Sequence, residues 1–414
     1  MGSRAPSCAK AGRWNGAVRV PSRISSSGPT GELLTWAYVR TRAYLSITSS
    51  EDPRGKLKSP PHPSQVLVIW SLRAIVKARP APGAQLLDVP EPSIRRNEVL
   101  VRVKATSICG TDVHIYEWND WASSRVKPPL IIGHEFAGEV VEVGRDVRGL
   151  AVGDSVSGET HIPCMRCEQC RTGNSHICDN LLLRGVDSDG CFAEYLALDE
   201  TTAWRNDKSL PYEVASAQEP LGNAVHTVFS GGGVEGKTVA VFGCGPIGVA
   251  AVGLCSASGA EAVYAVDVSE FRLRLAQEFG ASHVVNASTD DPVKEILGRT
   301  GGRGVDVFLE MAGAGETIRQ GLKVLRPGGR ACILGLPDGP VEMDVTNDVV
   351  MKGITIHGIY GRRMFSTWYT VASYLRSGKV DLSKLITHRL RMYDYRKAFE
   401  LMKSGQSGKI VMTP

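Results

Sequence analysis

The fold of this chain follows from eleven residues, Thr238-Val-Ala-Val-Phe-Gly-Cys-Gly-Pro-Ile-Gly248. The first five form a continuous apolar run, which is typical of a strand buried on both faces of a parallel sheet. Glycines then stand at 243, 245 and 248, in the spacing that joins a strand to a helix around a bound dinucleotide. Gly243 permits the tight turn, Gly245 lets the backbone approach a pyrophosphate, and Gly248 allows the helix to pack closely.

An acidic residue lies where such a unit needs one. The strand predicted over residues 263–267 ends in Asp267, whose carboxylate would accept hydrogen bonds from both hydroxyls of an adenosine ribose. The same carboxylate would repel a 2′-phosphate, because like charges brought together disfavour each other. Arg272 lies nearby and would favour a phosphate, but the carboxylate should decide the choice. We therefore expect NAD, rather than NADP, as the cofactor.

Strands and helices alternate around this unit. Helices are predicted over residues 247–258 and 272–280, with Gly280 ending the second, and strands over 305–309 and 330–335. This alternation is typical of a doubly wound α/β sheet. Two more helices and a strand are predicted after it, at 368–376, 394–405 and 409–412.

The residues before this region predict a different architecture. Short strands are expected over 72–78, 98–106, 139–144 and 153–156, separated by turns that contain Gly and Pro. Such a pattern indicates a small β-rich domain. A chain of 414 residues is also too long for one ordinary core, so we expect two domains.

Three residues of the β-rich part offer the ligand types that zinc accepts. Cys109 supplies a thiolate, His134 an imidazole and Glu135 a carboxylate. Taken singly, a cysteine in an apolar segment or a histidine after glycine is most often structural. Together, with glycines where the backbone must turn around them, they predict a zinc site with one open coordination position. Such a site is a Lewis acid, and beside a dinucleotide that accepts hydride it predicts a dehydrogenase.

A second cluster has the spacing Cys164-x2-Cys167-x2-Cys170-x7-Cys178. Four thiolates close a tetrahedron and leave no open position, so the cluster predicts a structural zinc site. Coincidental free thiols and an iron–sulfur cluster are the alternatives. The tight loop next to a zinc Lewis-acid site argues against the iron–sulfur cluster. The other cysteines lie largely in apolar segments, and this usage predicts a reducing compartment, the cytoplasm, rather than a disulfide scaffold.

The net charge of +5 is unevenly distributed. Residues 1–65 contain ten basic and three acidic side chains, so the rest of the chain carries −2. This balance gives no sign of nucleic-acid binding, and no apolar run is long enough to predict a membrane span. We interpret residues 1–70 as a disordered tail or the product of an upstream start codon, with an Arg- and Ser-rich transit peptide as the alternative.

With these motifs in hand, the chain resembles the zinc-dependent medium-chain dehydrogenases over residues 72–414. Residues 114–118, His-Ile-Tyr-Glu-Trp, resemble the group that oxidises L-threonine and differ from sorbitol and alcohol dehydrogenases. The segments that carry the likeness are Thr106-Ser-Ile-Cys-Gly-Thr-Asp-Val-His-Ile-Tyr-Glu-Trp118, Gly158-Glu-Thr-His161, Glu219-Pro-Leu-Gly-Asn-Ala-Val-His226, Ile359-Tyr-Gly-Arg-Arg-Met-Phe365 and Thr367-Trp-Tyr.

The resemblance implies a GroES-like catalytic domain at residues 71–222, a Rossmann domain at 223–366, and a C-terminal segment, 367–414, that returns to the catalytic domain. It implies a homotetramer that oxidises the 3-hydroxyl of L-threonine to 2-amino-3-oxobutanoate while NAD is reduced. It implies one catalytic and one structural zinc in each subunit.

The resemblance also implies roles for single residues. Cys109, His134 and Glu135 would hold the catalytic zinc, and the four clustered cysteines the structural one. Thr111 and His114 would relay the proton, Glu219 would act beside the zinc as a ligand or in the relay, and His161 would lie near the substrate. The NAD contacts it implies, besides the glycines, are Ile247, Asp267, Arg272, Leu334, Gly335, Leu336, Ile359 and Tyr360.

Two alternatives stay open at this point. One is a polyol or secondary-alcohol dehydrogenase of the sorbitol or butanediol type, which would use the same metal and cofactor. The other is a non-catalytic NAD-binding protein of the same fold that has lost zinc, and the intact ligand set argues against it. Substrate turnover separates the first alternative, and a metal analysis separates the second.

Overall fold

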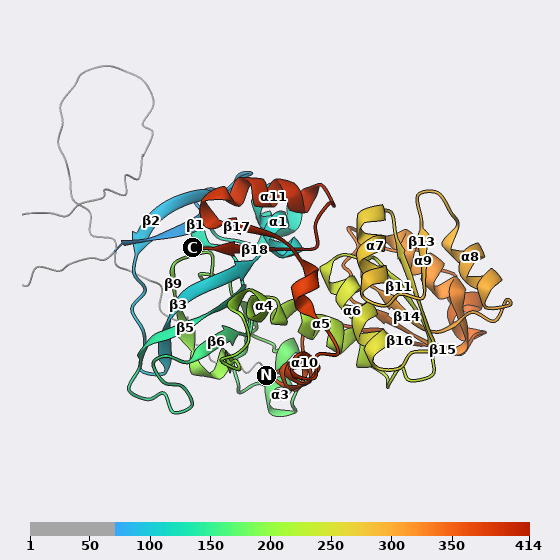
Figure 1. The fold of residues 1–414 in the computed structure, drawn as a ribbon, viewed down its shortest axis with the longest axis horizontal. Coiled ribbons are helices and arrows are strands. Elements are labelled where there is room, and N and C mark those ends of the chain that lie inside the picture. The colour runs from blue at the N-terminus through green and yellow to red at the C-terminus, as the bar shows by residue number, and fades with distance from the viewer. Residues whose placement is uncertain (1–70) are drawn as a thin grey trace, which may run out of the picture. The chain divides into compact units, whose positions relative to one another are not determined.

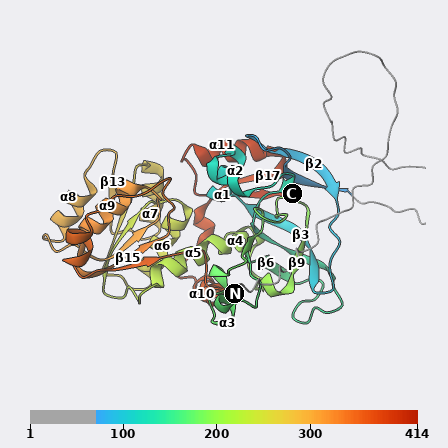
Figure 2. The ribbon, with the colours of Figure 1, turned by 180° about the vertical axis from the view of Figure 1, so that it is seen from behind.

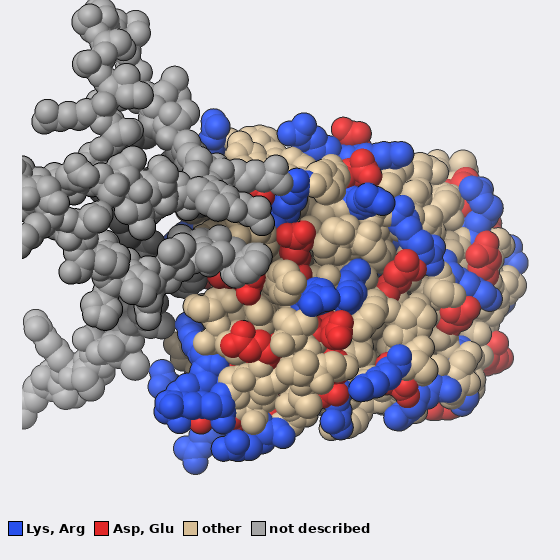
Figure 3. All heavy atoms as spheres, turned by 60° about the vertical axis from the view of Figure 1, so that its left-hand side comes forward, with Lys and Arg blue, Asp and Glu red and all other residues tan. Residues whose placement is uncertain are grey.

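The computed structural model of the protein describes residues 71–414. The interpretation of residues 1–70 therefore lies outside the described residues. Within residues 71–414, no helix is long and apolar enough to cross a membrane. On the face drawn in Figure 3, basic and acidic side chains lie among one another, as the near-neutral balance of this part of the chain leads one to expect.

One part of the chain is a parallel six-stranded sheet with helices on both faces (Figure 1). In order across the sheet, the strands are β13 (His283–Asn286), β12 (Ala262–Asp267), β11 (Thr238–Phe242), β14 (Val305–Glu310), β15 (Leu325–Ile333) and β16 (Thr355–Gly358). The helices that pack on it include α6 (Pro246–Ala257), α7 (Glu270–Glu278), α8 (Pro292–Arg299) and α9 (Gly315–Val324). The doubly wound α/β fold predicted from the sequence is confirmed.

The central strand β11 shows why this part folds as it does. All five of its side chains are buried. Val239 and Val241 pack with α6 and α7 in one core, whereas Ala240 and Phe242 pack with α8 and α9 in another. Alternate side chains of a strand point to opposite faces, so a strand covered on both faces must be apolar throughout. This is the reason that the apolar run 238–242 identified the strand.

The other part of the described chain is built mainly from antiparallel strands, with β17 and β18 as a parallel pair. Its main sheet has the order β10 (Ala203–Arg205), β6 (Ser155–Gly158), β5 (Glu135–Val143), β3 (Glu98–Ser107), β18 (Lys409–Thr413) and β17 (Ile386–Arg391), and β9 (Tyr195–Asp199) also pairs with β3. The smaller sheets are β2 (Gln85–Pro90), β1 (Ser71–Lys77) and β4 (Leu130–Ile131), and the pair β7 (His161–Ile162) and β8 (Leu182–Leu183).

Short helices connect these strands, and Figure 2 shows several of them from behind. The α-helices are α1 (Gly110–Glu117), α2 (Asp120–Arg125), α3 (Glu168–Arg171), α4 (Tyr212–Ser216) and α5 (Gln218–Phe229). The 3₁₀ helices are η1 (Ser175–Ile177), η2 (Glu200–Thr202), η4 (Leu382–Leu385) and η5 (Met392–Asp394), and η3 (Val345–Val350) is a π-helix.

The C-terminal residues rejoin the antiparallel sheet. β18 pairs with β3, with Val411 opposite Ser107, and β17 pairs with β18. Helix α10 (Ser366–Arg376) packs beside α5, and α11 (Tyr395–Lys403) packs on α1, where the Tyr116 and Phe399 rings stack with centroids 4.3 Å apart. The last strand therefore lies beside the strand that leads to Cys109. The predicted domain limits stay predictions, and α5 crosses the one drawn after residue 222.

Several elements were not predicted from the sequence. β2 reads Gln-Leu-Leu-Asp-Val-Pro, without a strict alternation of apolar and polar residues, because its side chains are only half-buried. Helix α5 contains Pro220 and Gly222, which hide its helical pattern. Burial and packing, rather than local preference, decide these elements.

Candidate active site

The three predicted ligands of the open metal site come together at the end of β3. Residue Ser107 of β3 lies opposite Glu135 of β5, so Cys109, two residues farther, reaches His134 and Glu135. One ligand atom from each of the three side chains lies within 4.8 Å of the others. We call this group the open trio. A thiolate, an imidazole and a carboxylate at this separation fit zinc.

The surroundings of His134 favour a positive charge. Its Nδ1 lies 3.5 Å from Oδ1 of Asp112, and both atoms are buried without a hydrogen-bond partner. Burial alone would lower the pKa of His134, but the negative charges of Asp112 and Cys109 hold that pKa well above its usual value. Because Nδ1 faces Asp112, Nε2 is the ring nitrogen available to a metal. Asp112 also accepts a hydrogen bond from the Cys109 backbone N–H at 2.9 Å.

Glu135 is paired from the far end of the chain. The Lys409 ammonium lies 2.5 Å from its Oε2 and also donates to the Ile108 carbonyl at 2.9 Å, and the Ser107 hydroxyl donates to the same carboxylate. Burial raises the pKa of Glu135, the Lys409 charge lowers it, and the charge of Glu219 raises it. One lysine thus faces several acids, and a cation bound by the trio would offset their remaining negative charge.

Glu219 lies at the start of α5 and is not one of the trio. Its Oε1 lies 2.6 Å from Nη1 of Arg362 and accepts a hydrogen bond from the Thr160 hydroxyl. Its charge still acts on Glu135, as the pKa of Glu135 indicates. Glu219 is therefore an acid that neighbours the open trio but does not belong to it.

The predicted relay residues lie on α1, directly after Cys109. The Thr111 hydroxyl is 3.8 Å from the Cys109 sulfur. His114 is exposed, and the Asn119 side-chain amide, 2.9 Å away, donates to its Nδ1. No hydrogen bond joins Thr111 to His114 among the described residues. Thr111 is half-buried and His114 is exposed, so the predicted path would run from beside Cys109 to solvent.

His161 is buried beside Tyr360, one of the predicted NAD contacts. Its Nδ1 lies 2.8 Å from Oε1 of Glu159 and 3.0 Å from Nη2 of Arg362. Its ring meets that of Tyr360 edge-on, with centroids 5.6 Å apart. Burial tends to raise the pKa of Glu159, but the Arg362 charge outweighs this and holds the pKa well below its usual range. Glu159 is therefore an anion in the folded protein.

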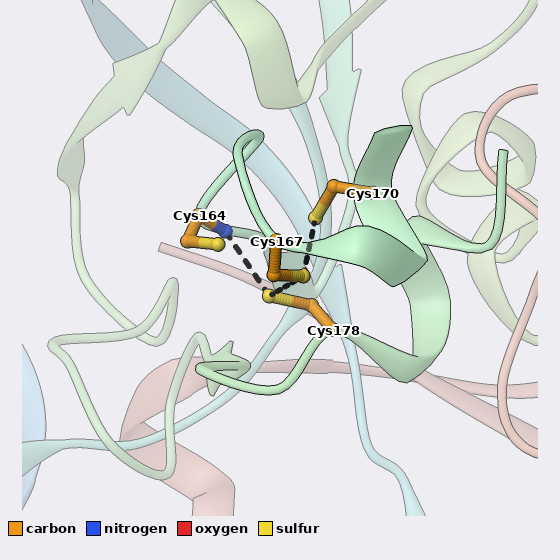
Figure 4. A group of neighbouring side chains, drawn as sticks. All are labelled: Cys164, Cys167, Cys170 and Cys178. Carbon is orange, nitrogen blue, oxygen red and sulfur yellow. Dashed lines mark hydrogen bonds between the residues drawn. The ribbon is translucent and has the colours of Figure 1, made fainter. Parts of the chain in front are cut away.

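The four clustered cysteines form a second group, which we call the closed cluster (Figure 4). Their sulfur atoms all lie within 4.8 Å of one another, and the Cys167 sulfur is 3.5 Å from that of Cys170. Backbone N–H groups of Arg166 and Cys167 lower the pKa of Cys164 to about 6, which favours a thiolate. Four sulfurs converging from one loop fit a structural zinc.

The dinucleotide fingerprint has the predicted geometry. Gly243 has a φ of +95°, and a Cβ there would lie 2.6 Å from the backbone nitrogen of Ala312. A Cβ on Gly248 would lie 1.9 Å from the Gly243 carbonyl oxygen. A Cβ on Gly245 would meet nothing within 4 Å, so this backbone faces open space at the start of α6, where Ile247 is the second residue. These residues fit a bound pyrophosphate.

Asp267 ends β12 next to the fingerprint. Its Oδ2 accepts a hydrogen bond from the Cys244 N–H at 2.7 Å, and its Oδ1 accepts from the Ser269 N–H at 2.9 Å. Arg272 is 4.0 Å away and is one-quarter exposed at its side chain. Each carboxylate oxygen keeps a lone pair for a ribose hydroxyl.

The other predicted NAD contacts lie at the carboxyl ends of β15 and β16. Leu336 is 78% exposed and Tyr360 is 40% exposed, which is unusual for such large side chains and fits a surface that a cofactor covers. Glu310 holds this region together, since its carboxylate accepts hydrogen bonds from Gly313 and Gly335 N–H groups. Ile359 is buried beneath them.

Five residues that surround the candidate site carried no predicted role: Asp112, Glu159, Glu310, Arg362 and Lys409. Asp112, Glu159 and Arg362 lie inside segments that carry the family likeness, and this likeness is the one sequence signal that could have found them. Glu310 and Lys409 lie outside those segments and act through contacts that spacing does not reveal, since Lys409 lies 274 positions from Glu135.

Comparison with known proteins agrees with this geometry. The family model described as "Alcohol dehydrogenase GroES-like domain" matches residues 95–208, and the one described as "Zinc-binding dehydrogenase" matches residues 246–377. A solved zinc-binding dehydrogenase from Sinorhizobium meliloti 1021, bound to NADP, is 30% identical with a TM-score of 0.77 over 83% of this chain and all of that one. The 2R,3R-butanediol dehydrogenase of Bacillus subtilis is 31% identical, with a TM-score of 0.75 over the same shares.

The sequence relatives are closer. The L-threonine 3-dehydrogenase of Caldanaerobacter subterraneus subsp. tengcongensis is 54% identical over 344 residues, which are 83% of this chain and 99% of that protein. The L-threonine 3-dehydrogenase of Pyrococcus abyssi is 51% identical over 339 residues, 82% of this chain and 97% of that protein. The chain therefore belongs to the zinc-dependent medium-chain dehydrogenases and, among them, to the family of the L-threonine 3-dehydrogenases.

Proposed function

We propose that the protein oxidises the 3-hydroxyl of L-threonine with NAD, giving 2-amino-3-oxobutanoate and NADH. The observation that carries this function is the 54% identity along 99% of an L-threonine 3-dehydrogenase, in a chain whose open trio is intact. Oxidation of a polyol or secondary alcohol is the second candidate, which the likeness to the butanediol dehydrogenase favours.

The side chains of the proposed active site have different roles. We assign Cys109, His134 and Glu135 to hold a zinc ion and Asp112 to orient His134. Zinc and the nicotinamide, when bound, supply a Lewis acid and a hydride acceptor. Buried acids around the trio keep the site negative, so a cation is held firmly, and Lys409 prevents Glu135 from becoming an unpaired buried charge.

The proton of the substrate hydroxyl must leave the buried site. We assign its path to Thr111, at the metal end, and to His114, at the solvent end. A hydroxyl donates and accepts at once, so Thr111 can pass a proton on. Asn119 donates to Nδ1 of His114, so in the neutral ring Nε2 carries the proton that would pass on to solvent. Glu219 and His161 stand as outer groups beside the reacting position, and we assign neither of them to the metal.

The choice of NAD over NADP rests on Asp267. Its carboxylate is buried at the end of β12, with both oxygens already aligned by backbone N–H groups. A 2′-phosphate would meet this fixed negative charge. We assign the pyrophosphate to Gly243, Gly245, Ile247 and Gly248, and the nicotinamide side to residues 334–336 and 359–360.

The experiment is a comparison of substrates. The purified protein is given NAD and, in turn, L-threonine, sorbitol and 2R,3R-butanediol, and NADH formation is followed. We expect kcat/KM for L-threonine to exceed the other two by at least about tenfold, since an enzyme that pairs the ammonium and carboxylate of threonine would leave its own polar groups unpaired with an alcohol that lacks them. The Cys109→Ser variant is the control for metal-dependent turnover. Faster turnover of butanediol than of L-threonine would establish the second candidate instead.

The state of assembly is proposed to be a homotetramer. One supporting feature is β16, the edge strand of the parallel sheet, whose Ile356 is exposed near the exposed side chains of Val350 and Met351. An unpaired edge with apolar flanks is a surface that proteins cover. Light scattering on the eluting protein measures the mass, and a monomer at working concentration would contradict the proposal.

We propose the cytoplasm as the compartment. The support is the state of the sulfur atoms, because all nine cysteines in the described residues are free and four of them sit at metal-ligand spacing. Fractionation of the source cells, with an antibody against the protein, would test this placement.

A further inference from the structure

One buried guanidinium joins three separate elements near the open trio. Arg362, 2% exposed, contacts both carboxylate oxygens of Glu159, with its Nε 3.1 Å from Oε2. Its Nη1 lies 2.6 Å from Oε1 of Glu219 and donates to the Asn223 amide oxygen at 3.0 Å. The indole N–H of Trp368, on α10, completes the group by donating to Glu159 at 2.7 Å.

The fold makes room for this side chain. A Cβ at Gly222 would lie 2.6 Å from Cδ of Arg362, so any larger residue would displace the arginine. Gly222 stands three positions after Glu219 in α5, and residues at this spacing share one face of a helix. The helix therefore presents the acid, a gap and the Asn223 amide to the same guanidinium.

The same guanidinium stands at the cofactor side of the site. Tyr360, a proposed NAD contact, is two residues before Arg362 and lies edge-on against His161. His161 contacts Glu159, and Glu159 contacts Arg362. A Cβ on Gly361 would lie 2.2 Å from the His161 ring, so this segment is packed tightly against the histidine. Few side chains, all in contact, separate the predicted nicotinamide position from Glu219.

We propose that Arg362 is a positioning residue for the reaction. It holds the Glu219 carboxylate beside the open trio but outside its set of metal ligands. It also links the position of Glu219 to residues 359–360, which are proposed to contact NAD. The inference deepens the proposed function and rests on it for the reaction concerned. Arginine suits this task because its planar fork fixes two carboxylates at once, which the single ammonium of lysine does not.

The test uses the full chain with cobalt in the open trio, because the absorption of cobalt reports its ligands. Wild type, Arg362→Lys and Arg363→Lys are compared. Arg363 is the matched control, since it is the next residue, is exposed and donates no hydrogen bond from its side chain to any residue of 71–414. Spectra are recorded with and without NAD and without any alcohol, and kcat and KM for L-threonine are measured on the zinc forms.

For Arg362→Lys we expect kcat to fall by about 10–100-fold, the usual effect of losing a group that orients a metal site. KM for L-threonine should change by less than about threefold, because Arg362 is enclosed by protein groups and leaves none of its donors for substrate. NAD should change the cobalt spectrum of wild type and of Arg363→Lys, and this response should be lost in Arg362→Lys.

Gly222→Ala provides a second route if Arg362→Lys does not fold. The added methyl displaces Arg362 without removing a charge, and alanine favours the helix. It should reproduce the lower kcat and the lost response to NAD. The proposal is wrong if a folded Arg362→Lys keeps both the wild-type kcat and the response, if Gly222→Ala keeps both, or if NAD leaves the wild-type spectrum unchanged. Because the spectra need no alcohol, they decide this proposal even if L-threonine proves not to be the substrate.

Discussion

The open trio and the closed cluster offer ligands to the same kind of ion but are held by opposite means. The closed cluster takes all four sulfurs from residues 164–178, and its partners are backbone N–H groups of the same loop. The open trio takes its ligands from the residue that precedes α1 and from the start of β5, and charged side chains from distant parts of the chain surround it. The proposed structural site therefore depends on a local loop, whereas the proposed catalytic site depends on long-range buried charge.

The largest effect that would separate the two centres is expected from Cys109→Ser. Losing a thiolate from a site with three protein ligands removes several kcal/mol of Lewis-acid stabilisation. At 1.36 kcal/mol per tenfold, kcat/KM should fall by about a thousandfold or more. The melting temperature should stay within about 2 °C of wild type, because the hydrophobic cores are untouched. Near-wild-type turnover by this variant would remove Cys109 from the reactive centre.

Cys167→Ser should have the reverse pattern. A closed thiolate site contributes folding energy, so we expect a loss of about 3 kcal/mol of unfolding free energy. At about 2–4 °C per kcal/mol, the melting temperature should fall by about 6–12 °C. Below that temperature kcat should remain within about threefold of wild type. Calorimetry and metal analysis measure the two effects, and unchanged melting with unchanged zinc content would show that the cluster binds no metal.

This contrast also explains what the sequence predicted. The closed cluster, β11 and the fingerprint are local patterns, so the spacing of Cys164–Cys178 and the apolar run 238–242 were enough to place them. The trio could be predicted because Cys109, His134 and Glu135 are residue types that bind zinc and lie near conspicuous glycines. The contacts that orient the trio could not be predicted, since Asp112 faces His134 and Lys409 faces Glu135 only when β3, β5 and β18 lie side by side.

Asp112→Asn tests that outer layer. Asparagine keeps the shape and can still accept from the Cys109 N–H, but it withdraws the charge that faces His134. Zinc affinity of the open trio should fall by about 10–100-fold, as is usual when the group behind a metal-bound histidine is changed. The closed cluster has no such carboxylate and should keep its metal. Competition with a chromophoric chelator measures both sites, and Asp120→Asn, an exposed acid on α2, is the control. Equal loss from both centres would mean that the variant acts through folding.

The smallest effect on the two metal centres is expected from the cofactor side, where Asp267→Ser should leave both metal contents unchanged and alter the choice of dinucleotide. The carboxylate is proposed to bind both ribose hydroxyls, and hydrogen bonds to a charged group contribute roughly 1.5–3 kcal/mol each. The ribose hydrogen bonds should each contribute less than this, because the Cys244 and Ser269 N–H groups already donate to the same two oxygens.

The net loss for NAD should therefore be about 10–100-fold in kcat/KM, at about 1.4 kcal/mol per tenfold. NADP should gain less than NAD loses, because Arg272 lies 4.0 Å from Asp267 and is placed to balance that acid rather than to meet a phosphate. The measurement is kcat/KM for both cofactors at saturating L-threonine, with Asp290→Ser, an exposed acid after β13, as the control. If Asp267→Ser and Asp290→Ser give the same NAD/NADP ratio, Asp267 does not bind the ribose. If Asp267→Ser also loses metal, the cofactor side and the open trio are coupled more closely than their separate hydrogen bonds indicate.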